Sequence, residues 1–180
     1  MLFFLLMVFT TQIVVSQSIQ KNDRIKQRID DYLTAGVSNG LSGAVLVYKE
    51  GKILLNKGYG FADKENKILN TPNTVFDIGS VSKQFTAAAI LKLEEQGKLK
   101  VEDSLSKFFK NLPEDKKNIT IHQLLIHSAG IIRAIGKSDF DIITTEDYFN
   151  ELFSTTLTHE PGAKHEYSNA GYSILSRIIE

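Results

Sequence analysis

Residues 43–63, GAVLVYKEGKILLNKGYGFAD, place the strongest constraint on what this chain can fold into. They contain two runs rich in β-branched and aliphatic residues, and Lys49-Glu50-Gly51-Lys52 between the runs predicts the turn of a β-hairpin. The chain after this hairpin predicts helices and loops. Because a sheet of two strands has open edges and is rarely stable alone, we expect an α/β fold that is truncated before further strands of the same sheet.

Helices are predicted from hydrophobic spacing and from start and stop signals. Residues 19–35 carry apolar side chains at helical spacing, and an Ala-rich helix is expected to begin near Ser80 and to end at Gly97. Thr120, followed by Gln123, forms the pattern of a capping box. Further helices are expected at 101–109, at 144–153, and from Tyr172 to the end after a loop over 158–171.

Composition excludes several classes of function. The 180 residues include 21 basic and 21 acidic side chains, so the net charge is zero and offers no basic field for nucleic acid. There is no cysteine, which excludes disulfides, thiol catalysis and cysteine-ligated zinc. The histidines lack metal-binding spacing, so no metal site is expected. No cofactor is expected either. The Gly-x-Ser-x-Gly elbow of α/β-hydrolases is missing too.

The N-terminus is apolar from Leu2 to Val15 apart from Thr10, Thr11 and Gln12. This run is shorter than the roughly 20 residues that a membrane-spanning helix needs, so no stable membrane span is expected. It resembles the apolar region of a secretory signal, although a basic segment before it is missing. We therefore expect residues 1–18 to be a signal peptide, residues 19–180 to form the domain, and the protein to be periplasmic or secreted. A buried N-terminal helix or strand is the alternative.

The stretch FDIGSVSKQFTAAAI, residues 76–90, contains a candidate nucleophile. Serine attacks a carbonyl only when a base removes its proton. Ser80 and Lys83 share one helix face while Ser82 points elsewhere, and Lys83 would have to be neutral to act as the base, which burial against Ala87 would favour. Ser80 also follows Gly79 at a helix start, where its backbone N–H is unpaired and can form half of an oxyanion hole.

A second element, HEYSNAGY, places Tyr167 and Asn169 in the loop ahead of the last helix. The phenol is suited to relay protons between a serine, a lysine and a leaving group, and the amide to orient a substrate carbonyl or the lysine. Both spacings recur elsewhere in the chain. We interpret one copy, Ser104 with Lys107, as part of a solvated surface helix. We interpret the other copy, Tyr148 with Asn150, as core packing.

Taken in order, FDIGSVSKQFTAAAI, LLIHSAGI and PGAKHEYSNAGY resemble the serine β-lactamase and penicillin-binding-protein superfamily. Within it, the chain is most similar to the class C-like group of cephalosporinases, D-alanyl peptidases and esterases, from about Ile29 onward. The resemblance implies a β-lactamase/transpeptidase-like fold, with an antiparallel sheet flanked by helices and a mostly helical lobe over about 100–160. It also implies these roles: Ser80 nucleophile, Lys83 and Tyr167 proton-transfer pair, and Asn169 substrate-binding.

Two departures from the family pattern are visible. The third motif of the family, a Lys-Thr-Gly or His-x-Gly strand that also supplies the second oxyanion N–H, does not occur in this sequence, so the site is expected to be incomplete. His-Ser-Ala-Gly stands where His-Thr-Ser-Gly is common, and we interpret His127 as structural.

The expected function is that of a secreted serine hydrolase acting through a Ser80 acyl-enzyme on amide or ester carbonyls. A β-lactam, a D-amino-acid peptide and an ester remain open as substrates, so the partner is a small molecule or peptide, with no nucleic acid. The alternative is a non-catalytic penicillin-binding or sensory module on the same fold.

Overall fold

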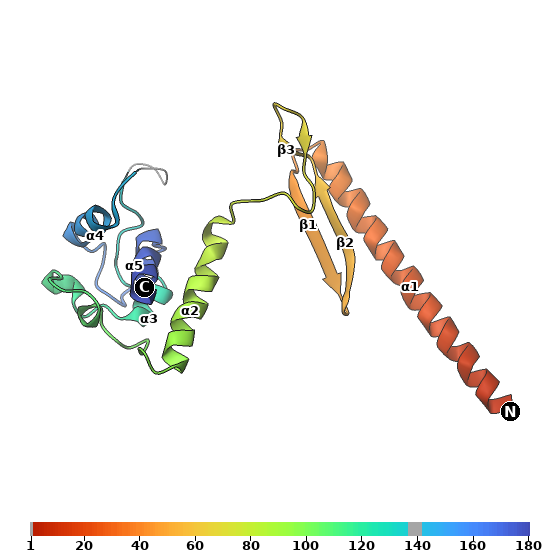
Figure 1. Ribbon diagram of the computed structural model, residues 1–180, viewed down its shortest axis with the longest axis horizontal. Coiled ribbons are helices and arrows are strands. Elements are labelled where there is room, and N and C mark those ends of the chain that lie inside the picture. The colour runs from red at the N-terminus through yellow and green to blue at the C-terminus, as the bar shows by residue number, and fades with distance from the viewer. Residues whose placement is uncertain (1, 137–141) are drawn as a thin grey trace. The chain divides into compact units, whose positions relative to one another are not determined.

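The structure is a computed structural model that describes residues 2–136 and 142–180. The chain divides into two compact units, Met1–Asp77 and Ile78–Glu180. The first unit holds a long helix and the strands, and the second holds the remaining helices (Figure 1).

The predicted hairpin is confirmed in the first unit. Strands β1 (Gly43–Lys49) and β2 (Lys52–Tyr59) pair antiparallel, with a register shift between Val47 and Tyr48. The turn residues Glu50 and Gly51 have φ values of 49° and 80°. Two consecutive left-handed residues are typical of a type I′ turn, whose twist matches that of the flanking strands.

A second, smaller hairpin follows and was not predicted. Strands β3 (Phe61–Asp63) and β4 (Ile68–Leu69) pair antiparallel within a stretch whose polar composition indicated only turns. The Asp63 carboxylate accepts hydrogen bonds from the Asn66 backbone N–H at 3.0 Å and from its side-chain amide at 2.6 Å. This local bonding forms the turn, and strands of two or three residues are too short to show an alternating pattern.

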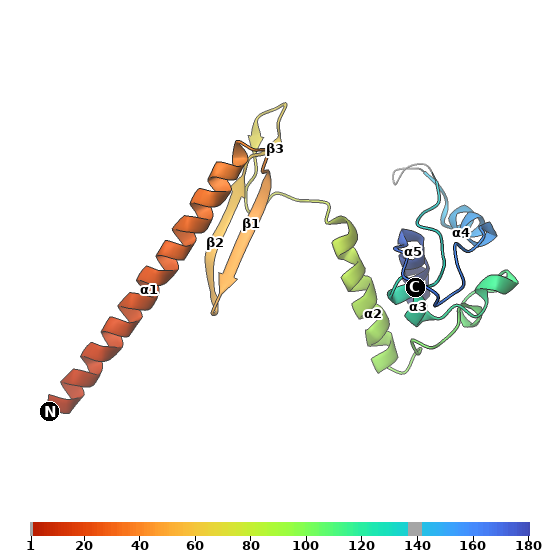
Figure 2. The same cartoon turned by 180° about the vertical axis from the view of Figure 1, so that it is seen from behind.

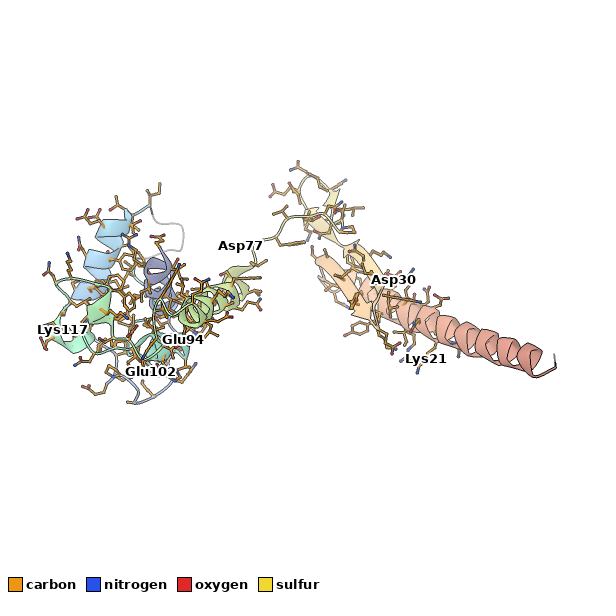
Figure 3. All side chains as sticks on the ribbon, turned by 60° about the horizontal axis from the view of Figure 1, so that its bottom comes forward. Lys21, Asp30, Asp77, Glu94, Glu102 and Lys117 are labelled. Atoms are coloured by element: carbon orange, nitrogen blue, oxygen red, sulfur yellow. The ribbon has the colours of Figure 1, made fainter. Side chains whose placement is uncertain are left out.

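Helix α1 (Leu2–Val37) confirms the helix predicted at 19–35 and extends it in both directions, through the segment expected to be a signal peptide. None of the helices among the described residues is both long and apolar enough to cross a membrane. Asp30, labelled in Figure 3, lies on the part of α1 that adjoins the strands. Its carboxylate accepts hydrogen bonds from Lys57 Nζ at 2.7 Å and from the hydroxyl of buried Tyr59 at 2.8 Å, which ties α1 to β2.

The second unit is built around helix α5 (Asn169–Ile179). Helices α2 (Lys83–Glu95) and α3 (Ile121–Leu125) both pack against α5, and α4 (Thr145–Ser154) contacts it through a hydrogen bond from Tyr148 to Ser173 (Figures 1 and 2). Short 3₁₀-helices complete the unit: η1 (Gly79–Ser82), η2 (Leu105–Lys107) and η3 (Glu114–Lys116). The core consists mainly of aliphatic side chains from the α-helices, from η2 and from the loops between them, including Ile90, Leu105, Ile119, Ile121, Leu124, Leu152, Ile174 and Leu175.

The ends of the helices follow the predicted signals. The Thr120 hydroxyl accepts the Gln123 N–H at 3.2 Å and the Gln123 side chain accepts the Thr120 N–H at 3.0 Å, so the capping box is confirmed. Gly97, with φ 70°, donates to Glu94 O, and Lys98 N donates to Leu93 O, which is a Schellman motif that ends α2. The Glu94 carboxylate, labelled in Figure 3, accepts the Val101 N–H at 2.8 Å and holds the chain that follows.

Two predicted helices need correction. Residues 101–109 form only the single 3₁₀ turn η2, because Ser104 bridges to Thr120 and Leu105 N donates to Ile119 O, so that backbone bonds run across to another segment. The last helix begins at Asn169 rather than Tyr172. Gly171, which lies in the predicted loop, is buried in the first turn of α5. Between 100 and 160 the described residues form helices, 3₁₀ turns and loops, as the predicted helical lobe requires.

Candidate active site

The second unit brings together the four residues predicted to form the site. The Tyr167 hydroxyl donates a hydrogen bond of 2.6 Å to Ser80 Oγ. Lys83 Nζ donates to Asn169 Oδ1 at 2.8 Å and to Ser80 Oγ at a longer 3.4 Å. Because α2 packs against α5, the two segments that carry these side chains meet although they are far apart in the sequence.

The backbone of η1 determines which serine faces the tyrosine. Gly79 has φ 49°, a left-handed conformation that favours glycine, and the chain then enters a 3₁₀ turn that leads into α2. Ser80 is exposed in this turn. The Ser82 hydroxyl instead donates to Gly79 O at 2.7 Å. The structure therefore places Ser80, and not Ser82, beside Tyr167.

The other side of the site is the start of α5. Ser168 is the N-cap: its hydroxyl accepts the Gly171 N–H at 2.8 Å and donates to Ile132 O at 2.6 Å. Tyr167 precedes the cap and lies in the loop, as predicted. Asn169, also predicted in the loop, is in fact the first residue of the helix.

Positive charge surrounds the Tyr167 phenol. Half-buried Lys83 holds its ammonium 5.0 Å from the centre of the Tyr167 ring and 5.5 Å from that of Tyr172. The Arg133 guanidinium lies 5.7 Å from the Tyr167 ring centre. Hydrogen bonding with Lys83, then with Ser80, and the charges of Lys83 and Arg133 lower the pKa of Tyr167. The phenol thus loses its proton more readily than an ordinary tyrosine, and its phenolate is suited to accept a proton from Ser80.

Sequence reasoning missed Arg133 and Ser168. The Arg133 carbonyl accepts the N–H groups of Asn169 at 2.7 Å and of Ala170 at 3.1 Å, so it anchors the helix that carries the site. Nothing in the local pattern around Arg133 indicates this contact. Ser168 did carry a signal, because a serine directly before a helical run is a preferred N-cap.

Two loops next to the site are joined through their backbones. Thr158 N donates to Gly130 O at 2.8 Å, and Gly162 N donates to Ser128 O at 2.7 Å. Gly130 has φ 73°, and a Cβ atom there would lie 2.1 Å from the His159 carbonyl oxygen. Only glycine fits at position 130, where the two loops cross. Gly130 comes shortly before Arg133 in one loop, and His159 comes before Tyr167 in the other.

The residue pairs that repeat the Ser80–Lys83 and Tyr167–Asn169 spacings make different contacts. Lys107 pairs with Asp103 at 2.5 Å, and Ser104 Oγ is 2.8 Å from Ser106 Oγ. Tyr148 lies in α4, where its hydroxyl donates to Ser173 Oγ at 3.1 Å and its ring is 5.3 Å from that of Phe149. The surface and packing interpretations of these residues agree with these contacts.

The fold is that of serine β-lactamases and penicillin-binding proteins. FmtA from Staphylococcus aureus superposes with a TM-score of 0.75 at 30% identity, over 86% of this chain and 42% of FmtA. A class C beta-lactamase solved in complex with cefoxitin superposes with a TM-score of 0.74 at 26% identity, over 88% of this chain and 45% of the enzyme.

The sequence matches the family described as Beta-lactamase over residues 23–180, and the chain belongs to this family. Among curated relatives, Protein flp of Staphylococcus aureus (strain NCTC 8325 / PS 47) is 36% identical over 165 residues, which cover 86% of this chain and 33% of flp. The chain thus spans about a third of the length of this relative.

Proposed function

We propose that this chain supplies the nucleophile and the proton-transfer residues of a serine hydrolase that forms an acyl-enzyme on Ser80. The observation that carries the proposal is the 2.6 Å hydrogen bond between Tyr167 and Ser80, with Lys83 Nζ at 3.4 Å from the same serine oxygen. A nucleophile in contact with a proton acceptor that a third group orients is the arrangement that activates serine.

Acylation follows from these contacts. As Ser80 Oγ forms a bond to the substrate carbonyl carbon, its proton passes to the Tyr167 phenolate. Lys83 and Arg133 favour this phenolate because they lower the pKa of Tyr167. The carbonyl oxygen becomes an oxyanion, and we expect the Ser80 backbone N–H in η1 to bind it, because the first N–H groups of a helix have no partner within the helix. When the tetrahedral intermediate collapses, the bond to the leaving nitrogen or oxygen breaks, and the Tyr167 phenol gives that atom its proton.

Deacylation uses the same residues. Water attacks the ester carbon while its proton passes to the Tyr167 phenolate; the bond to Ser80 Oγ then breaks, and Oγ takes the proton back. Asn169 accepts a hydrogen bond from Lys83 through Oδ1, which leaves its NH₂ group as a donor for a substrate carbonyl. Lys83 is thereby held between Asn169 and Ser80.

The candidate substrates carry an amide or ester carbonyl: a β-lactam, a D-amino-acid peptide or a simple ester. Such substrates, and the apolar N-terminal segment predicted to be a signal peptide, support a protein that acts in the periplasm or outside the cell. The alternative is a penicillin-binding or sensory module that is acylated without turnover. The contacts among Ser80, Lys83, Tyr167 and Asn169 favour the enzyme over a binding module that has lost its chemistry, because such a module has no need to keep all four side chains.

Covalent labelling tests the proposal. The full-length protein is treated with a fluorophosphonate and with a fluorescent penicillin, and the labelled peptide is identified by mass spectrometry. We expect label on Ser80, none in Ser80→Ala, and unchanged labelling in the matched variants Ser82→Ala and Ser104→Ala. Label on either of these other serines contradicts the assignment. Turnover of nitrocefin or p-nitrophenyl esters by the unlabelled protein, as against a single permanent acylation, separates the enzyme from the module.

A further inference from the structure

His127 contacts Tyr167 and both of its neighbours in the sequence. Its carbonyl accepts the Glu166 N–H at 2.7 Å, and its ring Nδ1 accepts the Ser168 N–H at 3.2 Å. Its ring lies 4.5 Å from the Tyr167 ring at an interplanar angle of 31°. One residue therefore holds the backbone on both sides of Tyr167 and the face of its phenol.

The backbone of His127 is in an uncommon conformation. Its φ is 57°, in the left-handed region where few residues other than glycine lie, although histidine, asparagine and aspartate are enriched there. Such a conformation costs free energy and persists only when surrounding contacts impose it. Here the hydrogen bonds to Glu166 and Ser168 depend on this conformation, because it directs the carbonyl and the ring toward the same loop.

We propose that His127 is a positioning residue: its neutral imidazole, protonated on Nε2, holds the Tyr167 hydroxyl against Ser80, and a proton on Nδ1 releases it. The proposal rests on the proposed function of Ser80 and Tyr167. A protonated Nδ1 is a donor facing the donor N–H of Ser168, so the hydrogen bond is lost.

The groups that face His127 keep it neutral. The His165 ring lies 5.7 Å from the His127 ring and edge-on to it, and the rings of Tyr167 and Tyr172 lie 4.5 and 5.0 Å from it. The ammonium of Lys83 lies over both tyrosine rings. Arg133 adds a further cation over Tyr167. Burial, then the charges of His165 and Lys83, lower the pKa of His127 below its ordinary 6.5. The Nδ1 atom of His127 is therefore an acceptor at neutral pH and becomes a donor only in acid.

Two variants of the full-length protein isolate the hydrogen bond. Both His127→Asn and His127→Gly tolerate a positive φ and both lose the stacked ring, but only asparagine offers an acceptor near the place of Nδ1. We expect Ser80 labelling by a fluorophosphonate to be about tenfold slower in His127→Gly than in His127→Asn, as for loss of one hydrogen bond. With falling pH below 6.5, wild-type labelling should decline more steeply than that of His127→Asn, which has no imidazole to protonate.

A measurement without catalysis separates this proposal from the proposed function. Nitrogen chemical shifts of ¹⁵N-histidine-labelled protein should show His127 protonated only on Nε2 at neutral pH, and slow exchange of the Ser168 amide should be lost as His127 titrates. If the wild type is not labelled on Ser80, the proposed function fails while these signals still test His127. Equal labelling rates in both variants, or an imidazole protonated on Nδ1 at neutral pH, would overturn the proposal. If His127→Gly does not fold, the pH profiles of wild type and His127→Asn decide.

Discussion

The hydroxyl of Tyr167 lies 2.6 Å from Ser80 Oγ although the two residues are 87 positions apart in the sequence. Each is placed by its immediate neighbour. Gly79 turns the chain into η1 on one side, and Ser168 caps α5 on the other. The packing of α2 against α5 then sets the distance between the two oxygens, so changes at the neighbours should be felt at the site.

Replacing Tyr167 by phenylalanine removes the group that exchanges a proton with Ser80. We expect Ser80 labelling to slow by about 10²- to 10⁴-fold, the range for loss of general acid–base catalysis. The matched control is Tyr148→Phe, which removes a hydroxyl bonded to Ser173 in α4. It should lower stability by about 1 kcal/mol and leave the labelling rate within twofold or so. Fast labelling of Tyr167→Phe would exclude the phenol from the reaction.

Arg133→Gln removes a cation next to the Tyr167 ring while it keeps the backbone carbonyl that anchors Asn169 and Ala170. Because the charges of Lys83 and Arg133 lower the pKa of Tyr167, the pKa should rise in the variant. The increase of the labelling rate with pH should then shift to higher pH. Arg177→Gln is the control, since Arg177 is exposed and pairs with Glu180. Identical pH profiles for both variants would show that Arg133 does not act on the phenol.

Gly130→Ala tests the crossing of the two loops. The added Cβ would lie 2.1 Å from the His159 carbonyl oxygen at a residue with φ 73°, so we expect a loss of at least about 3 kcal/mol in the free energy of unfolding. Gly97→Ala has a similar φ of 70° and no atom within 4 Å of the added Cβ. It should cost about 1–2 kcal/mol. Urea denaturation of both variants measures the difference, and equal losses would mean that the loops separate easily.

The contact of Asp30 with Tyr59 makes the first unit sensitive to pH at both extremes. Burial and the hydrogen bond to Asp30 raise the pKa of Tyr59 to about 12, from an ordinary value of 10. The unfolded chain therefore loses this proton first, and the stabilisation present below pH 10 should be lost as pH rises through 12. The Lys57 hydrogen bond, then that of Tyr59, lower the pKa of Asp30 below 3.8, so its stabilisation should be lost as pH falls below that value.

Amide hydrogen exchange in β2, followed across pH, checks this prediction. In Asp30→Asn the amide protection should be lower at neutral pH and both pH-dependent losses should be smaller. Asp31→Asn is the matched control on the same helix, because Asp31 is exposed and bonds only to Gln27 among the described residues. If Asp31→Asn weakens β2 as much as Asp30→Asn, the contact between α1 and β2 is not the cause.

How far the sequence predicts this molecule depends on the range of the interactions. The hairpin turn at Glu50-Gly51 and the shared face of Ser80 and Lys83 follow from local geometry, and both are found. The helix α5 begins three residues before the predicted Tyr172, because Gly171, which lies in the predicted loop, is buried in the first turn beneath the Ser168 cap. Arg133 acts on the site through contacts with residues more than thirty positions away, and no periodic pattern encodes such contacts.

The backbone hydrogen bonds that join residues 127–133 to 158–170 have a consequence for how such a site can change. Main-chain donors and acceptors are the same for nearly every residue type, so the frame around Tyr167 depends little on the side chains that these loops present. Outside the residues that react or hold the site, namely His127, Gly130, Arg133, Tyr167, Ser168 and Asn169, we expect substitutions along the loops to alter what the site recognises without displacing the groups that react. Residues that determine specificity can thus change while the residues that react stay in place, which makes these loops the favourable place for selection to act.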